Sequence, residues 1–257
     1  MKLEYQPLID APITGHAVVS HSDWLKARKE LLAKEKELTR LGDRINAERR
    51  ALPWEKVEKT YLFDSHDGKA TLADLFGGKR QLIIYHFMYA PGWEEGCVGC
   101  SHMGDHIDGA RRHFEQVDVA FAAVSRGSLK ELDAFKKRMG WNFNWVSSGG
   151  CDFNRDYKVS FTKEQMVARE KDYNFGTLEV DYDELPGISV FYQDEEGNVF
   201  HTYSAYARGL DILLGSHHFL DLTPKGRCAG PDLASWLKHH DKYDNALPLK
   251  SSCCGGL

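Results

Sequence analysis

Two cysteines separated by two residues, Cys97 and Cys100, are the residues of this sequence best suited to chemistry. An apolar run over 81–88 (QLIIYHFM) predicts a buried strand before their loop, and an amphipathic helix is expected from Cys97 onward. A sulfur at the start of a helix lies beside unpaired backbone N–H groups and the positive end of the helix dipole, which favours thiolate over thiol. We therefore predict that Cys97 is a nucleophile.

The expected helix also positions the second cysteine. At about 100° per residue from Cys97, four apolar residues form one stripe, and Cys100 borders it; they are Met103, Ile107, Ala110 and Phe114. Cys97 then lies off the core face, and Cys100 lies beneath it. An exposed attacking sulfur beside a shielded resolving sulfur is the arrangement used in thiol–disulfide exchange. A pair of purely structural thiols is the less favoured interpretation.

Metal binding is a competing chemistry for the same segment. Cys97, Cys100, His102 and His106 supply four zinc or iron ligands within ten residues. On the expected helix, however, the two histidines lie roughly opposite Cys100, so one ion would not easily reach both pairs. A solvated histidine pair is favoured, and the four-ligand metal site remains the alternative.

Three further side chains are candidate auxiliaries of the site. His86, on the buried strand, is either a hydrogen-bonded core residue or a proton acceptor for the buried thiol. Glu94, with its neighbour Glu95, would oppose thiolate formation if it lies close, whereas Arg208 would favour it.

The chain has six cysteines in 257 residues, too few for a disulfide scaffold. Cys253 and Cys254 are adjacent and are either partners for the site, ligands for a soft metal, or idle exposed thiols, which is the simplest interpretation. Cys151 and Cys228 have no neighbouring ligand pattern and are interpreted as structural or incidental.

Charge and hydropathy exclude several classes of partner. The formal charge is −5, and no long run of either sign forms a patch for phosphates, which argues against nucleic acid and anionic membranes. The first residues lack the apolar stretch of a secretory signal, and no segment approaches the roughly 20 apolar residues of a membrane helix. We expect a cytoplasmic protein.

A long helix is predicted over 22–50, with an apolar residue every seventh position: Trp24, Leu31, Leu38 and Ile45. Packing of this stripe on the protein's own domain is the favoured interpretation. A homodimer contact through the same stripe is the alternative.

Strands and helices alternate after Tyr61, which predicts an α/β sheet. The strands are expected near 61–63, 81–88, 117–125 and 144–146, with a hairpin over 188–192 and 199–203, and the helices from Cys97, over 129–139 and after Pro231. We expect a helical extension over 1–55, one domain over 56–245 with a packed insertion at 149–185, and a flexible tail over 246–257.

Several sequence blocks resemble known families. GKATLADLFGGKRQLIIYHFM before a cysteine loop is similar to the opening of thioredoxin-like and peroxiredoxin-like (AhpC/TSA-type) domains. YHFMYAPGWEEGCVGCS, RMGWNFNWVSS, FNRDYKVSF and PGISVFYQDEEGNVFHTYSAYARG resemble a bacterial thioredoxin-like family, domain of unknown function 899, from about Val18 to Tyr243. The resemblance implies a thioredoxin-like fold, a central mixed β-sheet flanked by helices, but no settled reaction.

The resemblance also implies residue roles. By analogy with thioredoxins, Pro186 is expected to be a cis proline that faces the cysteines and contacts substrate. Trp93 is a second candidate substrate contact, although thioredoxins carry Trp directly before the first cysteine. Peroxiredoxins carry Thr or Ser three residues before the reactive cysteine, where this chain has Glu94, and this argues against peroxidase activity.

These residues predict a thiol–disulfide oxidoreductase that acts on a protein or small-molecule disulfide. Cys97 attacks, Cys100 releases the product, and an external thiol reductant reopens the resulting bridge. No GxGxxG fingerprint occurs, so no bound flavin, nicotinamide or other cofactor is expected. The alternatives are a thiol peroxidase, in which Cys100 resolves a Cys97 sulfenic acid, and a non-enzymatic module that binds a partner or a metal.

Overall fold

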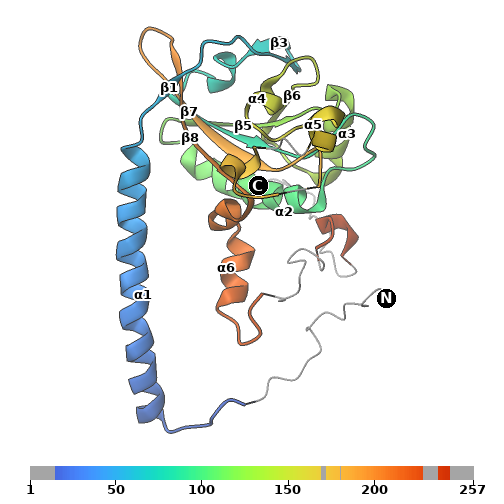
Figure 1. Ribbon diagram of the computed structural model, residues 1–257. Helices are drawn as coiled ribbons and strands as arrows, with labels where there is room; N and C mark the ends of the chain where they lie inside the picture. The colour runs from blue at the N-terminus through green and yellow to red at the C-terminus, as the bar shows by residue number, and fades with distance from the viewer. Residues whose placement is uncertain (1–14, 169–171, 180, 228–236, 244–257) are drawn as a thin grey trace, which may run out of the picture.

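The structure is a computed structural model that describes residues 15–168, 172–179, 181–227 and 237–243 (Figure 1). The strands are β1 (Glu55–Lys56), β2 (Leu62–Ser65), β3 (Gly68–Thr71), β4 (Gln81–His86), β5 (Val119–Ser125), β6 (Asn144–Ser147), β7 (Gly187–Gln193) and β8 (Val199–Tyr206). The α-helices are α1 (His21–Arg50), α2 (Val98–Phe114), α3 (Leu129–Met139), α4 (Phe153–Asp156), α5 (Lys163–Ala168) and α6 (Gly215–Asp221). Short 3-10 helices are η2 (Asp74–Phe76), η3 (Tyr173–Gly176), η4 (Ala207–Leu213) and η5 (His240–Lys242).

The described strands form one mixed sheet in the order β1-β8-β7-β4-β5-β6-β2-β3. Strands β4, β5 and β6 are parallel, with α2 and α3 as the connections between them, and the antiparallel hairpin β7–β8 pairs with β4. The predicted thioredoxin-like fold is confirmed by this arrangement. Parallel strands bring their carboxyl ends to one edge of the sheet, so the loops after β4 and β5 lie together at that edge.

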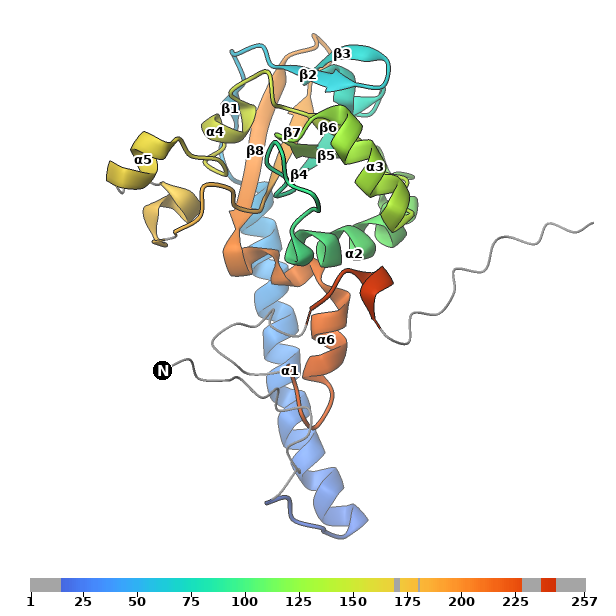
Figure 2. The same cartoon turned by 90° about the vertical axis from the view of Figure 1, so that its right-hand side faces the viewer.

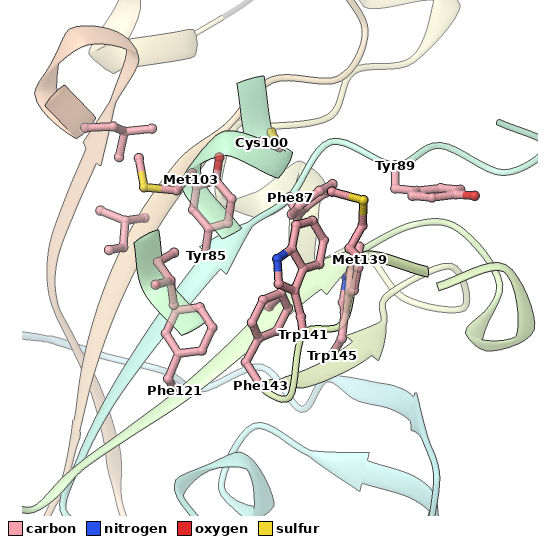
Figure 3. Packing of buried hydrophobic residues seen from close by; sticks show 14 of the residues in the cluster. Tyr85, Phe87, Tyr89, Cys100, Met103, Phe121, Met139, Trp141, Phe143 and Trp145 are labelled. Carbon is pink, nitrogen blue, oxygen red and sulfur yellow. The ribbon is translucent and has the colours of Figure 1, made fainter. Parts of the chain in front are cut away.

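Strand β4 has both faces buried, as its apolar sequence predicts, and its alternate side chains enter different cores. Ile83 and Tyr85 face the core under α2 and α3, whereas Leu82 and Ile84 face a core closed by η2 and Phe153. The first core is unusually aromatic, with Phe87, Trp141, Phe143 and Trp145 packed against one another (Figure 3). This core is the support beneath the cysteine-bearing end of α2.

The predicted long helix is confirmed as α1, which begins after Ser20, whose hydroxyl accepts a hydrogen bond from the Asp23 N–H. The expectation that it packs on its own domain is wrong. None of its residues is buried, and the helix extends away from the sheet (Figures 1 and 2). In its last turn the Arg49 guanidinium lies over the Tyr203 ring of β8.

Parts of the described residues within 149–185 pack against the sheet, whereas α5 has no buried residue. Phe153 is fully buried in the core opposite α2, while Val159, Phe161, Tyr173, Leu185 and Tyr206 form a third, smaller core. The predicted helix after Pro231 begins outside the described ranges. The predicted tail over 246–257 lies wholly outside them. Within the described ranges, no helix is both long enough and apolar enough to cross a bilayer.

Candidate functional site

The two cysteines lie where β4 feeds into α2. Cys97 is the residue before the first turn of α2 and is half-buried, whereas Cys100 is 1% exposed. The Met88 backbone holds both residues: its carbonyl accepts from the Cys97 N–H at 3.2 Å, and its N–H donates to the Cys100 sulfur at 3.4 Å. Cys97 is therefore the more exposed residue of the pair, and Cys100 is shielded.

The loop before Cys97 is held tightly against the aromatic core. A Cβ at Gly96 would lie 2.8 Å from carbons of both the Phe87 and Phe135 rings, closer than such atoms approach in proteins. Only glycine fits between these two rings without displacing one of them. The position of Cys97 is thus set by packing as well as by the start of the helix.

The electrostatic environment separates the two sulfurs. The Cys100 thiol donates a hydrogen bond to the Cys97 sulfur, and with the N–H groups of Cys100 and Gly99 it lowers the pKa of Cys97 to about 6 despite partial burial. Burial, together with the neighbouring Cys97 sulfur, holds the pKa of Cys100 well above its ordinary value. At neutral pH, Cys97 is a thiolate and Cys100 is a thiol.

Tyr85 is a site residue that the sequence analysis missed. Its hydroxyl points toward Cys100 (Figure 3) and donates a hydrogen bond to the Cys100 sulfur, which favours the Cys100 thiolate. Alternation along the strand could have identified Tyr85 from the sequence. Tyr85 and His86 are adjacent in β4, so only one of the two side chains faces α2.

His86 is the residue of that pair on the other face, so its predicted role as proton acceptor for Cys100 is wrong. It stacks on Phe153 and Tyr157 in the opposite core, and its Nε2 shares a hydrogen bond of 2.8 Å with the Ser189 hydroxyl. Burial, with a contribution from His201, lowers its pKa to about 3, so it is neutral. The alternative interpretation, a hydrogen-bonded core histidine, is the correct one.

The charged residues expected to tune Cys97 are not among the causes of its pKa shift. Glu94 is exposed, and Glu95 forms ion pairs with Arg138 and Lys242. Arg208 pairs with Asp211 at 3.0 Å. The depressed pKa of Cys97 therefore has its causes in hydrogen bonds to the sulfur and not in a neighbouring cation.

The predicted substrate contacts lie at the same edge of the sheet as the cysteines. Trp93 packs against the α2 core and, with Glu94, lines a groove of about 410 Å³ beside the cysteine loop. Pro186 precedes Gly187, which pairs with His86 near the carboxyl end of β4. The expected cis bond is wrong, because no described peptide bond is cis. The Tyr173 hydroxyl instead fixes the Pro186 carbonyl by a 2.7 Å hydrogen bond.

A second groove, larger than the one beside Trp93, lies away from the cysteines. Its volume is about 760 Å³, and it is bordered by Leu52 and Pro53 just after α1, by β8 and by Phe175. Arg208 lines this groove. The groove is therefore not part of the dithiol site.

His102 and His106 are not a solvated pair, which corrects the favoured interpretation. The residues that open α6 cover them: the Ser216 N–H donates to His106 Nε2 at 2.9 Å, and the Ser216 hydroxyl lies 2.5 Å from His102 Nε2. Burial, with His106 and His217 nearby, lowers the pKa of His102 to about 4. Among the described residues, no three His, Cys, Asp or Glu side chains are placed to share a metal ion, so the four-ligand alternative is not assembled.

No curated protein sequence matches the chain. Among solved structures, a cysteine-to-serine mutant of peroxiredoxin Q from Xanthomonas campestris has 20% sequence identity and a TM-score of 0.43, over 65% of this chain and 98% of that chain. A putative thiol-disulfide oxidoreductase from Bacteroides vulgatus has 15% identity and a TM-score of 0.36, over 62% of this chain and 92% of that chain.

A family model covers the sheet, α1 and the dithiol site together. It is described as a bacterial protein of unknown function (DUF899) and matches residues 13–243. This span contains the sequence blocks on which the resemblance to the same family rests. The chain therefore belongs to the DUF899 family of bacterial proteins.

Proposed function

We propose that the protein is a thiol–disulfide oxidoreductase that uses Cys97 as nucleophile and Cys100 as resolving thiol. The observation that carries the proposal is the hydrogen bond from the Cys100 thiol to the sulfur of the half-buried Cys97, whose pKa is lowered to about 6. A thiolate at neutral pH, with a second thiol already in contact, is what exchange with a disulfide requires.

The first step is attack of the Cys97 thiolate on one sulfur of a protein or small-molecule disulfide. A mixed disulfide forms, and the other substrate sulfur leaves as a thiolate. In this proposal the substrate contacts Trp93, which lines the groove of about 410 Å³, and Pro186, which precedes the strand paired with the end of β4.

The second step is release of the product by Cys100. Burial raises the pKa of Cys100 most, and the charged Cys97 sulfur raises it further. In the mixed disulfide the charge on Cys97 is gone, while the hydrogen bonds from Tyr85 and the Met88 N–H remain and favour the Cys100 thiolate. Cys100 then attacks the Cys97 sulfur, the substrate leaves reduced, and an external thiol reopens the Cys97–Cys100 bridge.

The pH dependence of Cys97 alkylation tests this electrostatic assignment. In the reduced protein, the rate at which iodoacetamide modifies Cys97, followed by peptide mass spectrometry, should rise with a midpoint near pH 6, since the pKa is about 6. Cys100→Ala removes the thiol donor and should raise the midpoint toward the ordinary thiol value of about 8.5. Cys100→Ser keeps a hydroxyl donor and should give an intermediate midpoint. A wild-type midpoint near 8.5 would contradict the assignment.

The same shift fixes the direction of a pH effect on stability. At pH values between the lowered pKa of Cys97 in the folded protein and the ordinary thiol pKa, the unfolded chain binds a proton at Cys97 and the folded chain does not. The reduced wild type therefore gains stability relative to Cys97→Ser as pH rises through this window, and loses that gain as pH falls through about 6.

A thiol peroxidase remains the alternative to be separated by experiment. Glu94 occupies the position at which peroxiredoxins carry a hydroxyl, and it is exposed. Stopped-flow mixing of the reduced protein with hydrogen peroxide distinguishes the two reactions. Oxidation of Cys97 at the rate of an ordinary thiol supports disulfide exchange, and fast, saturable oxidation supports the peroxidase.

We further propose that the exposed stripe of α1 pairs with α1 of a second copy. Leu31, Leu38 and Ile45 are 44–69% exposed, and their seven-residue spacing is the repeat by which two helices pack along a common seam. Leu31→Glu with Leu38→Glu should convert a dimer to a monomer in size-exclusion chromatography with light scattering. Lys29→Glu with Lys36→Glu, off the stripe, is the matched control. A monomeric wild type would contradict this proposal.

A further inference from the structure

Residues 237–243, here called the clasp, lie against the loop that presents Cys97. Within the clasp, His239 is 2% exposed, and its Nε2 lies 2.9 Å from the Gly96 carbonyl oxygen. A carbonyl oxygen accepts and does not donate, so Nε2 carries a hydrogen and donates it. The other ring nitrogen, Nδ1, lies 3.4 Å from the Glu95 carboxylate. One imidazole ring therefore contacts both residues immediately before Cys97.

The hydrogen bond from His239 holds one end of the peptide group that precedes Cys97. The Gly96 carbonyl and the Cys97 N–H belong to the same planar unit. The N–H donates to the Met88 carbonyl at 3.2 Å, and the carbonyl accepts from His239 at 2.9 Å. Because this plane is held at both ends, it cannot rotate freely about the chain direction. The Cα atom of Cys97, which is bonded to the nitrogen of this group, is held in place with it.

Packing holds the ring of His239 in this position. The ring lies edge-on to Phe135, with the two centroids 5.3 Å apart. The same Phe135 ring leaves no room for a Cβ atom at Gly96. Histidine, phenylalanine and glycine thus form one contact beside the cysteine loop. A phenylalanine at position 239 keeps the aromatic contact and loses the donor, whereas a glutamine keeps a donor and loses the ring.

The residues that follow His239 anchor the clasp to the two helices that flank the loop. His240 Nδ1 lies 2.7 Å from the Asp105 carboxylate on α2. The Asp241 carboxylate accepts two hydrogen bonds from the Arg138 guanidinium on α3, at 2.7 and 3.0 Å. These contacts fix the backbone of the clasp relative to both helices, so His239 has a defined position relative to the first turn of α2.

The Cys97 sulfur depends on this position because short-range contacts stabilise its anion. The contacts are hydrogen bonds from the Cys100 thiol and from the N–H groups of Cys100 and Gly99. Hydrogen bonds weaken steeply as their distance and angle depart from the optimum. A small rotation of Cys97 relative to the first turn of α2 therefore weakens all three together.

We propose that His239 is a positioning residue for Cys97, because its hydrogen bond to the Gly96 carbonyl holds the intervening peptide in the orientation that directs the sulfur to its donors. The inference rests on the proposed dithiol function and adds to that site a residue 143 positions beyond Gly96. His239 acts through the backbone, so the steps of disulfide exchange are unchanged. Its effect is on the fraction of Cys97 that is thiolate.

The pH profile of Cys97 alkylation by iodoacetamide separates this role from a purely structural one. In the reduced full-length protein, His239→Phe should raise the midpoint from near pH 6 by about 0.5–1 pH unit, the equivalent of one net hydrogen bond. His239→Gln supplies an amide N–H for the Gly96 carbonyl and should return the midpoint close to the wild-type value. A structural role for the ring predicts the reverse order. Because glutamine does not titrate, a retained midpoint also belongs to Cys97 and not to His239.

Two further variants complete the experiment. His113→Phe changes an exposed histidine in the last turn of α2 and is the matched control, with the wild-type midpoint expected. Asp241→Ala loosens the clasp without altering the aromatic contact and should raise the midpoint in the same direction as His239→Phe. It decides the test if circular dichroism shows that His239→Phe does not fold.

An unchanged midpoint in folded His239→Phe, or an equal rise in His239→Phe and His239→Gln, overturns the inference. A wild-type midpoint near 8.5 overturns it as well, because no stabilised thiolate then exists to be positioned. Failure of the proposed function is distinguishable, since the wild type then forms no Cys97–Cys100 bridge in a redox titration while the alkylation midpoints still report on His239.

Discussion

Replacing Cys97 by serine should lower the rate of disulfide reduction by about 10³-fold or more. A serine hydroxyl does not ionise near neutral pH, so the hydrogen bonds that stabilise the Cys97 thiolate have no anion to act on. The measurement is turnover of a disulfide substrate, such as oxidised insulin, with dithiothreitol as reductant.

Two further variants make this result specific. Cys100→Ser keeps the nucleophile and should lose turnover while the mixed disulfide of Cys97 with substrate accumulates, because the resolving sulfur is absent. Cys151→Ser changes a cysteine outside the α2 core and should keep the wild-type rate. Turnover by Cys97→Ser within tenfold of the wild type would show that another group is the nucleophile.

Trp145→Ala should lower the free energy of unfolding by about 3–5 kcal/mol. Trp145 is fully buried, contacts the rings of Phe87 and Phe135, and donates its indole N–H to the Ser125 hydroxyl at 3.0 Å. Truncation leaves a cavity directly beneath the rings that position Gly96. Denaturant unfolding followed by circular dichroism measures the change.

Trp54→Ala is the matched control for this prediction. Trp54 is 51% exposed and contacts Tyr192 and Phe200 on the sheet surface, so its truncation should cost no more than about 1.5 kcal/mol. Equal losses for the two tryptophans would contradict the packing described for the core beneath the site.

Local signals predicted much of the fold. The helix over 129–139 forms with these bounds because Ser128 and Glu131 make a reciprocal capping box and Gly140 ends it in a left-handed conformation. The apolar run of β4, the helix after Cys97 and the hairpin of β7 and β8 also follow from periodicity and turn residues.

Errors arose where a tertiary contact decides the outcome. The periodicity of α1 shows an apolar stripe but not what the stripe contacts, and it remains exposed. The covering of His102 and His106 depends on Ser216, more than 100 residues away. His239 and Lys242 have no local pattern that would connect them with Gly96 and Glu95 of the cysteine loop. His86 is different, because side chains alternate between the two faces of β4. Once Tyr85 is assigned to the face under α2, its neighbour His86 must lie on the opposite face.

The central claim is that Cys97 and Cys100 form a reversible disulfide, and redox titration with mass-spectrometric readout tests it most directly. Purified protein, first confirmed by metal analysis to be empty, is equilibrated in glutathione buffers and alkylated. The account predicts loss of two alkylation sites, at Cys97 and Cys100, in one reversible two-electron transition with a defined potential. Retention of both free thiols across the oxidising range, or a stoichiometric bound metal in place of the bridge, would contradict it.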